Sequence, residues 1–259
     1  MHGFRPFLGA AVAVALAAHL AAQNAPQNPA GEYTRADIEA GSRVYAQCVG
    51  CHGVNGDQIP NVDLRRGQFP TVVSDADIVR LMATGKPAAG MPPFSVLRTD
   101  EVTALVAYIR SGFDAAGTAV KVGDPGRGEA LFSGKGGCGT CHRVNGRGSY
   151  SATDLSEIGV MRKPASLQRA LLDPAGAMIP GNRSVRAVTR DGRTMRGRRL
   201  NEDAYSIQLI DEQSRLVSLA KADLRSVEAI PTSMPSYETT LTADERADLI
   251  AYLLSLKGR

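Results

Sequence analysis

Cys48-Val49-Gly50-Cys51-His52 and Cys138-Gly139-Thr140-Cys141-His142 repeat one pattern, Cys-x-x-Cys-His, and together they use all four cysteines of the 259-residue chain. Two common interpretations of such pairs fit poorly. A zinc ribbon joins cysteine pairs about 15 to 20 residues apart, whereas Cys51 and Cys138 are 87 positions apart (138 minus 51). A redox dithiol gives no reason for a histidine after the second cysteine in both copies.

The interpretation that accounts for the histidine is covalent attachment of c-type haem, for which this spacing is typical. Two thiols one helical turn apart can add to the two vinyl groups of one porphyrin, and the adjacent imidazole can bind the iron. We therefore expect two covalently bound haem c groups, each with one iron. The residues expected to hold them are Cys48, Cys51 and His52 for the first and Cys138, Cys141 and His142 for the second.

The similarity between the two halves extends beyond the motifs. Gly41 and Gly128 each precede an aromatic residue on a segment that leads into the motif. The same Val-Asn-Gly follows both motifs, at 54–56 and at 144–146. Such self-similarity indicates an internal repeat.

A second spacing is shared farther along each half. Met91 precedes Tyr108 by 17 positions (108 minus 91), and Met234 precedes Tyr252 by 18 (252 minus 234). Each tyrosine lies in a segment whose apolar residues recur at helical spacing. Each half is thus expected to contain a leading helix, the motif, a loop, a middle helix, a methionine loop and a closing helix. Three helix starts are predicted by a hydroxyl three residues before an acid, at Thr34, Ser74 and Thr242.

Between 181 and 231 the apolar residues change from helical spacing to alternation with polar residues. Alternating segments flank Asp191-Gly192, a strong hairpin signal, and two further segments follow at 205–209 and 215–219. We expect four or five short strands in a small curled antiparallel sheet, with a barrel as one form of it.

With these motifs, each half resembles a class I cytochrome c domain. The second half, with its strands and the segments Leu171-Leu-Asp-Pro-Ala and Ser233-Met-Pro, resembles the β-inserted haem-binding domains of Acidobacteria and Planctomycetes cytochromes. The resemblance implies a mainly α fold of two tandem helical domains, the second with the β insertion. It also implies that Met91 and Met234 bind the irons opposite His52 and His142.

Other methionines compete for these roles. Met234 lies 92 positions after His142 (234 minus 142), against 39 between His52 and Met91 (91 minus 52). Met161 and Met178 are nearer, and Met178 has a proline close by but lacks the closing helix that follows Met234. Met82 and Met195 are interpreted as packing or surface residues, since methionine often fills irregular gaps in a core.

The expected domain limits follow from these segments. They are a signal peptide at 1–22, a linker at 23–31, the first domain at 32–114, a second linker at 115–122 and the second domain at 123–259, with its insertion at about 182–230. A short charged start and an apolar run from Phe7 to Leu20 predict export to the periplasm. An uncleaved run would instead anchor the protein, and no later segment is apolar enough to span a membrane.

Seven arginines fall between Arg183 and Arg199 in a chain of net charge +4. They could form a docking patch for an acidic redox partner, or a solvated strand face whose charges discourage edge pairing. In the first half, Arg65 or Arg66 could lie near a haem propionate.

The expected function is transfer of single electrons between a donor dehydrogenase, for instance a quinoprotein, and a terminal oxidase or another cytochrome. Nucleic acid is not expected as a partner. Two other classes stay open: a di-haem enzyme of the peroxidase or thiosulfate-oxidising type, which requires an open haem site, and a sensory module in which the insertion binds a partner. No catalytic residue is predicted, because a methionine at each iron would close both sites.

Overall fold

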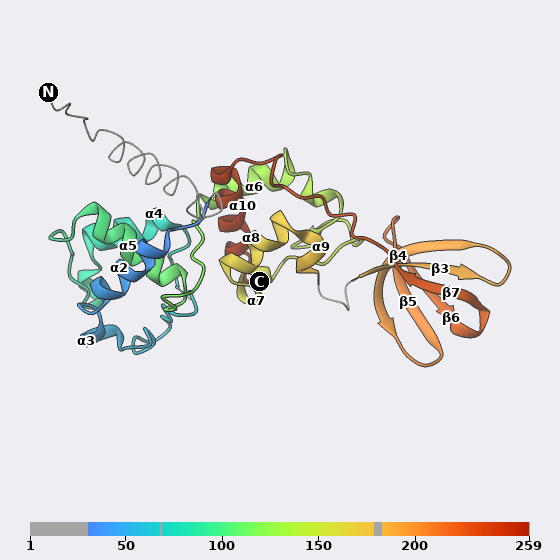
Figure 1. The fold of residues 1–259 in the computed structure, drawn as a ribbon, viewed down its shortest axis with the longest axis horizontal. Coiled ribbons are helices and arrows are strands. Elements are labelled where there is room, and N and C mark those ends of the chain that lie inside the picture. Colours follow the sequence, from blue (N-terminus) through green and yellow to red (C-terminus); the bar gives the residue numbers. More distant parts are fainter. Residues whose placement is uncertain (1–30, 68, 179–182, 259) are drawn as a thin grey trace, which may run out of the picture. The chain divides into compact units, whose positions relative to one another are not determined.

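The computed structural model describes residues 31–67, 69–178 and 183–258. The predicted signal peptide, 1–22, and all of the predicted linker at 23–31 except Gly31 lie outside the described residues. The described chain is mainly helical with a small antiparallel sheet in its C-terminal part, which confirms the expected fold class (Figure 1). In the ranges given above, no helix is long and apolar enough to cross a lipid bilayer.

The first half has the predicted order of elements. These are α2 (Arg35–Tyr45), α3 (Val49–His52), α4 (Asp75–Thr84), the 3-10 helix η1 (Pro87–Ala89) and α5 (Thr99–Arg110). Thr34 and Ser74 begin α2 and α4 as predicted, each through a capping box with the aspartate three residues later. The core between the helices includes Val44, Tyr45, Ile78, Leu105, Val106 and Ile109.

The second half repeats the plan with additions. Its elements outside the insertion are α6 (Pro125–Ser133), the 3-10 helix η2 (Cys138–Thr140), β1 (Arg143–Val144), β2 (Arg147–Gly148), α7 (Ile158–Met161), α8 (Pro164–Leu172), α9 (Pro174–Ala177) and α10 (Ala243–Ser255). Thr242 begins α10 through a capping box with Glu245, as predicted. The core of this half includes Phe132, Leu167, Leu171, Leu241, Leu249 and Ile250.

A glycine lets the leading and closing helices cross closely in both halves. A Cβ atom added at Gly41 would overlap the backbone of α5 and lie 2.7 Å from the Cβ of Tyr108. A Cβ atom added at Gly128 would overlap the backbone of α10 and lie 2.8 Å from the Cβ of Tyr252. The shared glycine and tyrosine of the two sequence halves are therefore the two sides of one helix crossing, formed twice.

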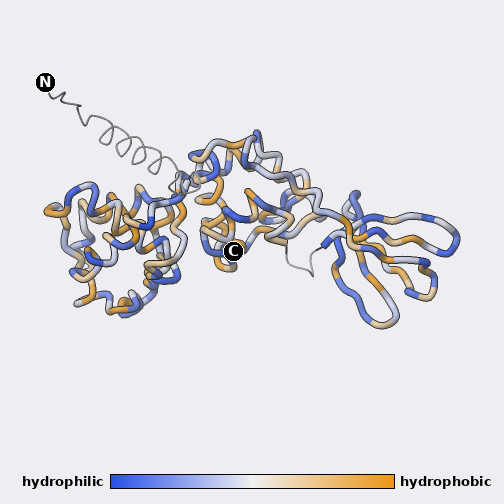
Figure 2. Tube along the Cα trace, in the orientation of Figure 1, coloured by the Kyte–Doolittle hydropathy of each residue, from blue (hydrophilic) through white to orange (hydrophobic). Residues whose placement is uncertain are grey.

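The insertion is a five-stranded antiparallel sheet with the strand order β6-β5-β4-β3-β7. Its strands are β3 (Ser184–Thr189), β4 (Thr194–Glu202), β5 (Ser206–Asp211), β6 (Leu216–Ala220) and β7 (Leu224–Ala229). The predicted hairpin joins β3 to β4, with Gly192 at a φ of 88° that glycine adopts without strain. That end of the hairpin is hydrophilic (Figure 2). No pairing of β6 with β7 occurs among the described residues, so the sheet is open and not the barrel considered above.

The arginine-rich segment runs along interior strands. β3 and β4 each pair with a strand on both sides, while β6 and β7 form the edges. The interpretation that these arginines discourage edge pairing is therefore wrong, because they do not lie on an edge. Several of them are paired within the insertion: Arg186 with Glu228, Arg193 with Asp191 and Arg199 with Glu202.

The segment predicted as the second linker, 115–122, is packed in its second part. Ala119, Val120 and Val122 are at most 2 % exposed. The amide of Tyr33 donates to the carbonyl of Ala119, and Asp75 accepts from the amide of Val122 through its side chain. These contacts tie the segment to the start of the first half and to the start of α4, so it does not behave as a free tether.

Candidate haem sites

In the first half, a cysteine of the motif and the predicted methionine meet the same core. Cys48 and Met91 are half-buried and both pack against the cluster that contains Val44 and Leu105. Cys51 is exposed. Burial raises the pKa of the Cys48 thiol. The first half thus brings the motif of α3 and the methionine loop to one apolar surface.

The second half does the same at its own core. Cys138 and Met234 are half-buried and pack against the cluster that contains Phe132 and Leu249. Cys141 is exposed, and all four cysteines are free thiols. The two sequence-predicted sites are therefore assembled separately, each from residues of its own half.

The competing methionines lie elsewhere. Met161 is 70 % exposed, and Met82 is a buried packing residue of the core of the first half. Met195 lies half-buried on β4, and Met178 is half-buried after α9. Of these and Met234, only Met234 packs against the core that Cys138 contacts.

The two histidines of the motifs differ in the hydrogen bonding of their Nδ1 atoms. The Nδ1 atom of His142 lies 2.7 Å from the carbonyl oxygen of Thr153 and must be the donor, since a carbonyl only accepts. This leaves the lone pair on Nε2 for a metal. The Nδ1 atom of His52 is buried and has no hydrogen-bond partner within the described ranges. Burial lowers the pKa of both imidazoles, which favours the neutral form that binds iron.

A tyrosine hydroxyl ties the backbone around each site. Tyr45 donates to the carbonyl of Gly53, next to His52, and Tyr237 donates to the carbonyl of Gly136, two residues before Cys138; both bonds are 2.7 Å. Burial is the main cause that raises the pKa of each tyrosine to about 12. Both phenols are therefore protonated donors throughout the neutral range.

The loops that carry the two methionines are held differently. Met91 forms a short antiparallel bridge with Lys86, through backbone bonds of 2.8 and 3.2 Å. In the second half, the buried guanidinium of Arg246 on α10 donates to the carbonyls of Tyr237, Glu238 and Leu241, which follow Met234. The first loop is fixed locally, and the second by a side chain from the closing helix.

These residues fit the haem that the motifs imply. Each half offers two free thiols one turn apart, a neutral imidazole that follows the second thiol, and a thioether packed against the same core. His142 in addition donates to the carbonyl of Thr153, the kind of contact that commonly orients a metal-binding histidine. A soft sulfur and an imidazole nitrogen form a ligand pair known for haem iron.

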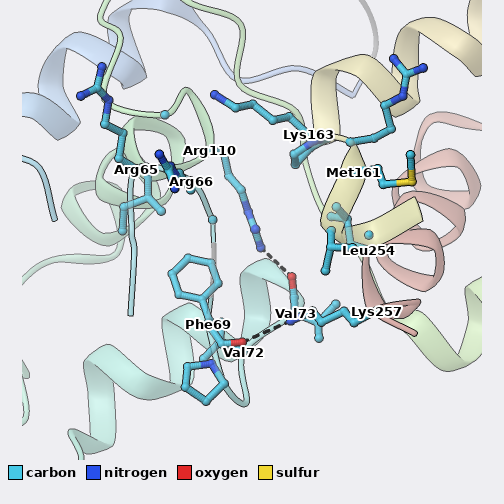
Figure 3. A pocket seen from close by; sticks show the side chains of 18 of the residues that line it. Arg65, Arg66, Phe69, Val72, Val73, Arg110, Met161, Lys163, Leu254 and Lys257 are labelled. Carbon is cyan, nitrogen blue, oxygen red and sulfur yellow. Dashed lines mark hydrogen bonds between the residues drawn. The ribbon is translucent and has the colours of Figure 1, made fainter. Parts of the chain in front are cut away.

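A separate cavity of about 670 Å³ has none of the predicted haem ligands in its lining (Figure 3). Arg65, Arg66, Lys163 and Lys257 line it, together with Arg110, whose guanidinium donates to the carbonyl of Val73. Arg110 is also paired with Asp75 at 2.7 Å. Both arginines considered for a haem propionate thus line a basic cavity.

Sequence reasoning missed two residues that support the second site. Thr153, whose carbonyl accepts the hydrogen bond from His142, belongs to no motif. Arg246 carried the one usable signal, since it interrupts the apolar face of a predicted helix. Arginine that is 6 % exposed in a helix requires partners such as the carbonyls that it contacts.

Comparison with known proteins agrees with this division. Residues 36–109 match the family described as cytochrome c oxidase, cbb3-type, subunit III, and residues 126–213 match the family described as cytochrome c. No curated protein matches the chain. A solved structure from Kuenenia stuttgartiensis, a reducing HAO-like protein complex, aligns at 21 % identity over 84 % of this chain and 96 % of that chain. The TM-score of that alignment is 0.22.

The two family matches fall on the two halves that the sequence repeat and the helix crossings define. Each contains one Cys-x-x-Cys-His motif, and the second extends into the sheet. Haem-based electron transfer is the activity that such domains indicate. The chain consists, over most of its described length, of two cytochrome c-type domains in tandem.

Proposed function

We propose that this chain is an exported di-haem cytochrome c that carries single electrons between a donor dehydrogenase and a downstream acceptor. His52 with Met91 and His142 with Met234 would hold the irons, and Cys48, Cys51, Cys138 and Cys141 would form the thioethers. When bound, each haem supplies an iron that cycles between the ferrous and ferric states. A quinoprotein dehydrogenase as donor, and a terminal oxidase or cytochrome as acceptor, suit this chemistry.

The observation that carries the proposal is the pairing of motif and methionine at each core. Cys48 and Met91 pack against one cluster, and Cys138 and Met234 against the other. A thioether at each iron leaves no coordination position for peroxide or a sulfur substrate. The arrangement therefore favours an electron carrier over an enzyme with an open haem.

The first test is haem content and ligation in the purified holoprotein. We expect two haems per chain as the pyridine adduct, low-spin spectra in both redox states, and the weak ferric charge-transfer band of methionine ligation at the strength of two sites. One haem per chain, or a high-spin component with that band at half strength, would contradict the closed-site carrier and support the enzymatic alternative.

A matched pair of variants tests the second ligand. Met234→Ala should halve the methionine band and make one haem high-spin, because the thioether is lost. Met161→Ala should leave both spectra unchanged, since that side chain is 70 % exposed. The opposite pattern would assign the ligand to Met161.

Export to the periplasm is part of the proposal. It requires that the segment 1–22 either be removed or stay as an anchor that holds the protein at the outer face of the inner membrane. Sequencing the N-terminus of the protein from a periplasmic fraction tests this point, and recovery of the haem-loaded chain only from the cytoplasm would contradict it.

A further inference from the structure

The loop that follows the second motif is joined to the β insertion at one place. The Oγ atoms of Ser149 and Ser214 lie 2.9 Å apart, and the amide of Tyr150 donates to Ser214 at 3.1 Å. Arg198 on β4 donates to the carbonyl of Tyr150 at 3.3 Å. Three hydrogen bonds thus link the sheet to two consecutive residues of the loop.

The same loop segment continues to the haem ligand. Ser149 donates to Ser151, and the amide of Ala152 donates to the carbonyl of Cys141 at 2.9 Å. Thr153, the next residue, supplies the carbonyl that accepts the Nδ1–H of His142. A continuous set of contacts therefore runs from Ser214 in the β5–β6 turn to the imidazole of His142.

Two features of the sheet suggest that this contact is specific. Ser214 has a φ of 62°, an unfavourable conformation for a residue other than glycine, and its hydroxyl makes both contacts with the loop. Arg198 is half-buried, and its Nε atom has no partner within the described residues. A strained backbone at Ser214 and a half-buried charge at Arg198 both cost free energy, which a turn that merely faces solvent would not require.

We propose that the β insertion braces the proximal side of the second haem, with Ser214 and Arg198 as positioning residues that hold the loop whose Thr153 carbonyl orients His142. The inference rests on the proposed function in one respect, namely that His142 binds iron. The first site has no such brace, because the Nδ1 atom of His52 is without a partner in the described chain.

A brace of this kind affects the iron through the imidazole. A histidine that donates firmly from Nδ1 to a carbonyl is a more basic ligand, and a more basic ligand stabilises ferric over ferrous iron. Loosening the loop should therefore raise the reduction potential of the second haem and leave that of the first unchanged.

The test uses the full-length holoprotein and the variant Ser214→Gly. Glycine removes the hydroxyl without steric cost at a positive φ, so the variant is expected to fold. By hydrogen exchange and mass spectrometry, the amides of 149–155 should exchange about tenfold faster, the effect of losing one to two hydrogen bonds. In a potentiometric titration, one of the two one-electron waves should move to higher potential. The shift should be at most about 59 mV, which corresponds to about a tenfold change in the equilibrium constant.

A charge-matched pair completes the test. Arg198→Gln should speed exchange in the loop, whereas Arg196→Gln removes an equal charge from an exposed residue of the same strand and should not. Wild-type exchange rates and potentials in Ser214→Gly, or equal effects of the two arginine variants, would overturn the brace. A haem content below two in the wild type would instead contradict the proposed function, and the exchange rates would still decide on the brace.

Discussion

The two cytochrome domains hold the residues that we propose as ligands with different supports. Both cross a leading and a closing helix at a glycine, and both tie the motif with a buried tyrosine hydroxyl. The first domain fixes its methionine loop by a local backbone bridge at Met91. The second uses Arg246 from the closing helix, and it holds its histidine through Thr153. Duplication preserved the helix crossing, and the loops around the ligands diverged.

The comparison indicates which substitutions should affect both domains and which should affect only one. The shared crossing consists of backbone in contact with backbone, which cannot relax around an added methyl group. The loop supports are single side chains with a few hydrogen bonds each, so their loss should affect one site and spare the other.

The largest effect is expected at the helix crossings. Gly41→Val and Gly128→Val should each destabilise their own domain by about 3 kcal/mol or more, because the added atoms overlap the facing helix. Denaturant unfolding monitored by circular dichroism measures this. Gly50→Ala is the control, since its Cβ would meet nothing within 4 Å. Tolerance of valine at either crossing would mean that the two domains do not share this contact.

The next effect concerns the methionine loop of the second domain. Arg246→Met should cost about 2 to 3 kcal/mol, because carbonyls of Tyr237, Glu238 and Leu241 lose a charged donor. The methionine band should fall towards half strength, since only the second site depends on this arginine. Arg169→Met, which removes an exposed charge from α8, should change neither. A full-strength band in Arg246→Met would show that Met234 does not need this support.

The tyrosines should give the two domains a similar response to alkali. The pKa of Tyr45 and of Tyr237 is raised to about 12 in the fold, against the usual value near 10. Between these values the unfolded chain has released a proton that the folded chain retains, so stability falls as pH rises above about 10. Tyr45→Phe and Tyr237→Phe should each reduce this fall in denaturant titrations from pH 9 to 11.5. An unchanged slope in the double variant would exclude the two phenols as its source.

The smallest effect is expected at the surface of the insertion. Arg193→Glu reverses a charge that is 74 % exposed and paired with Asp191. If the arginine-rich segment docks an acidic partner, electron transfer to the second domain should slow about threefold at low salt and recover at high salt. Stopped-flow rates across ionic strength measure this, with Arg193→Lys as the charge-conserving control. Equal rates for all three proteins would remove the docking role.

Much of the fold was predictable because its signals are local. The capping pairs at Thr34, Ser74 and Thr242 and the hairpin at Asp191-Gly192 involve residues at most a few positions apart. The openness of the sheet and the interior position of β3 and β4 were not predictable, since strand order depends on pairings between distant segments. β3 pairs with β7, about forty residues later, and Val185 of β3 and Leu224 of β7 lie in one buried cluster.

The sequence by itself determined the two Cys-x-x-Cys-His motifs, the duplication and the succession of helices and strands, because spacing and periodicity act within one or two turns of chain. Only the tertiary structure decided that Met234 and not Met161 packs against the core that Cys138 contacts, that the segment before Asp124 is buried, and that Ser214 reaches Ser149 across 65 positions. Those outcomes depend on which apolar faces and polar groups meet when distant segments pack together, and no local pattern encodes that choice.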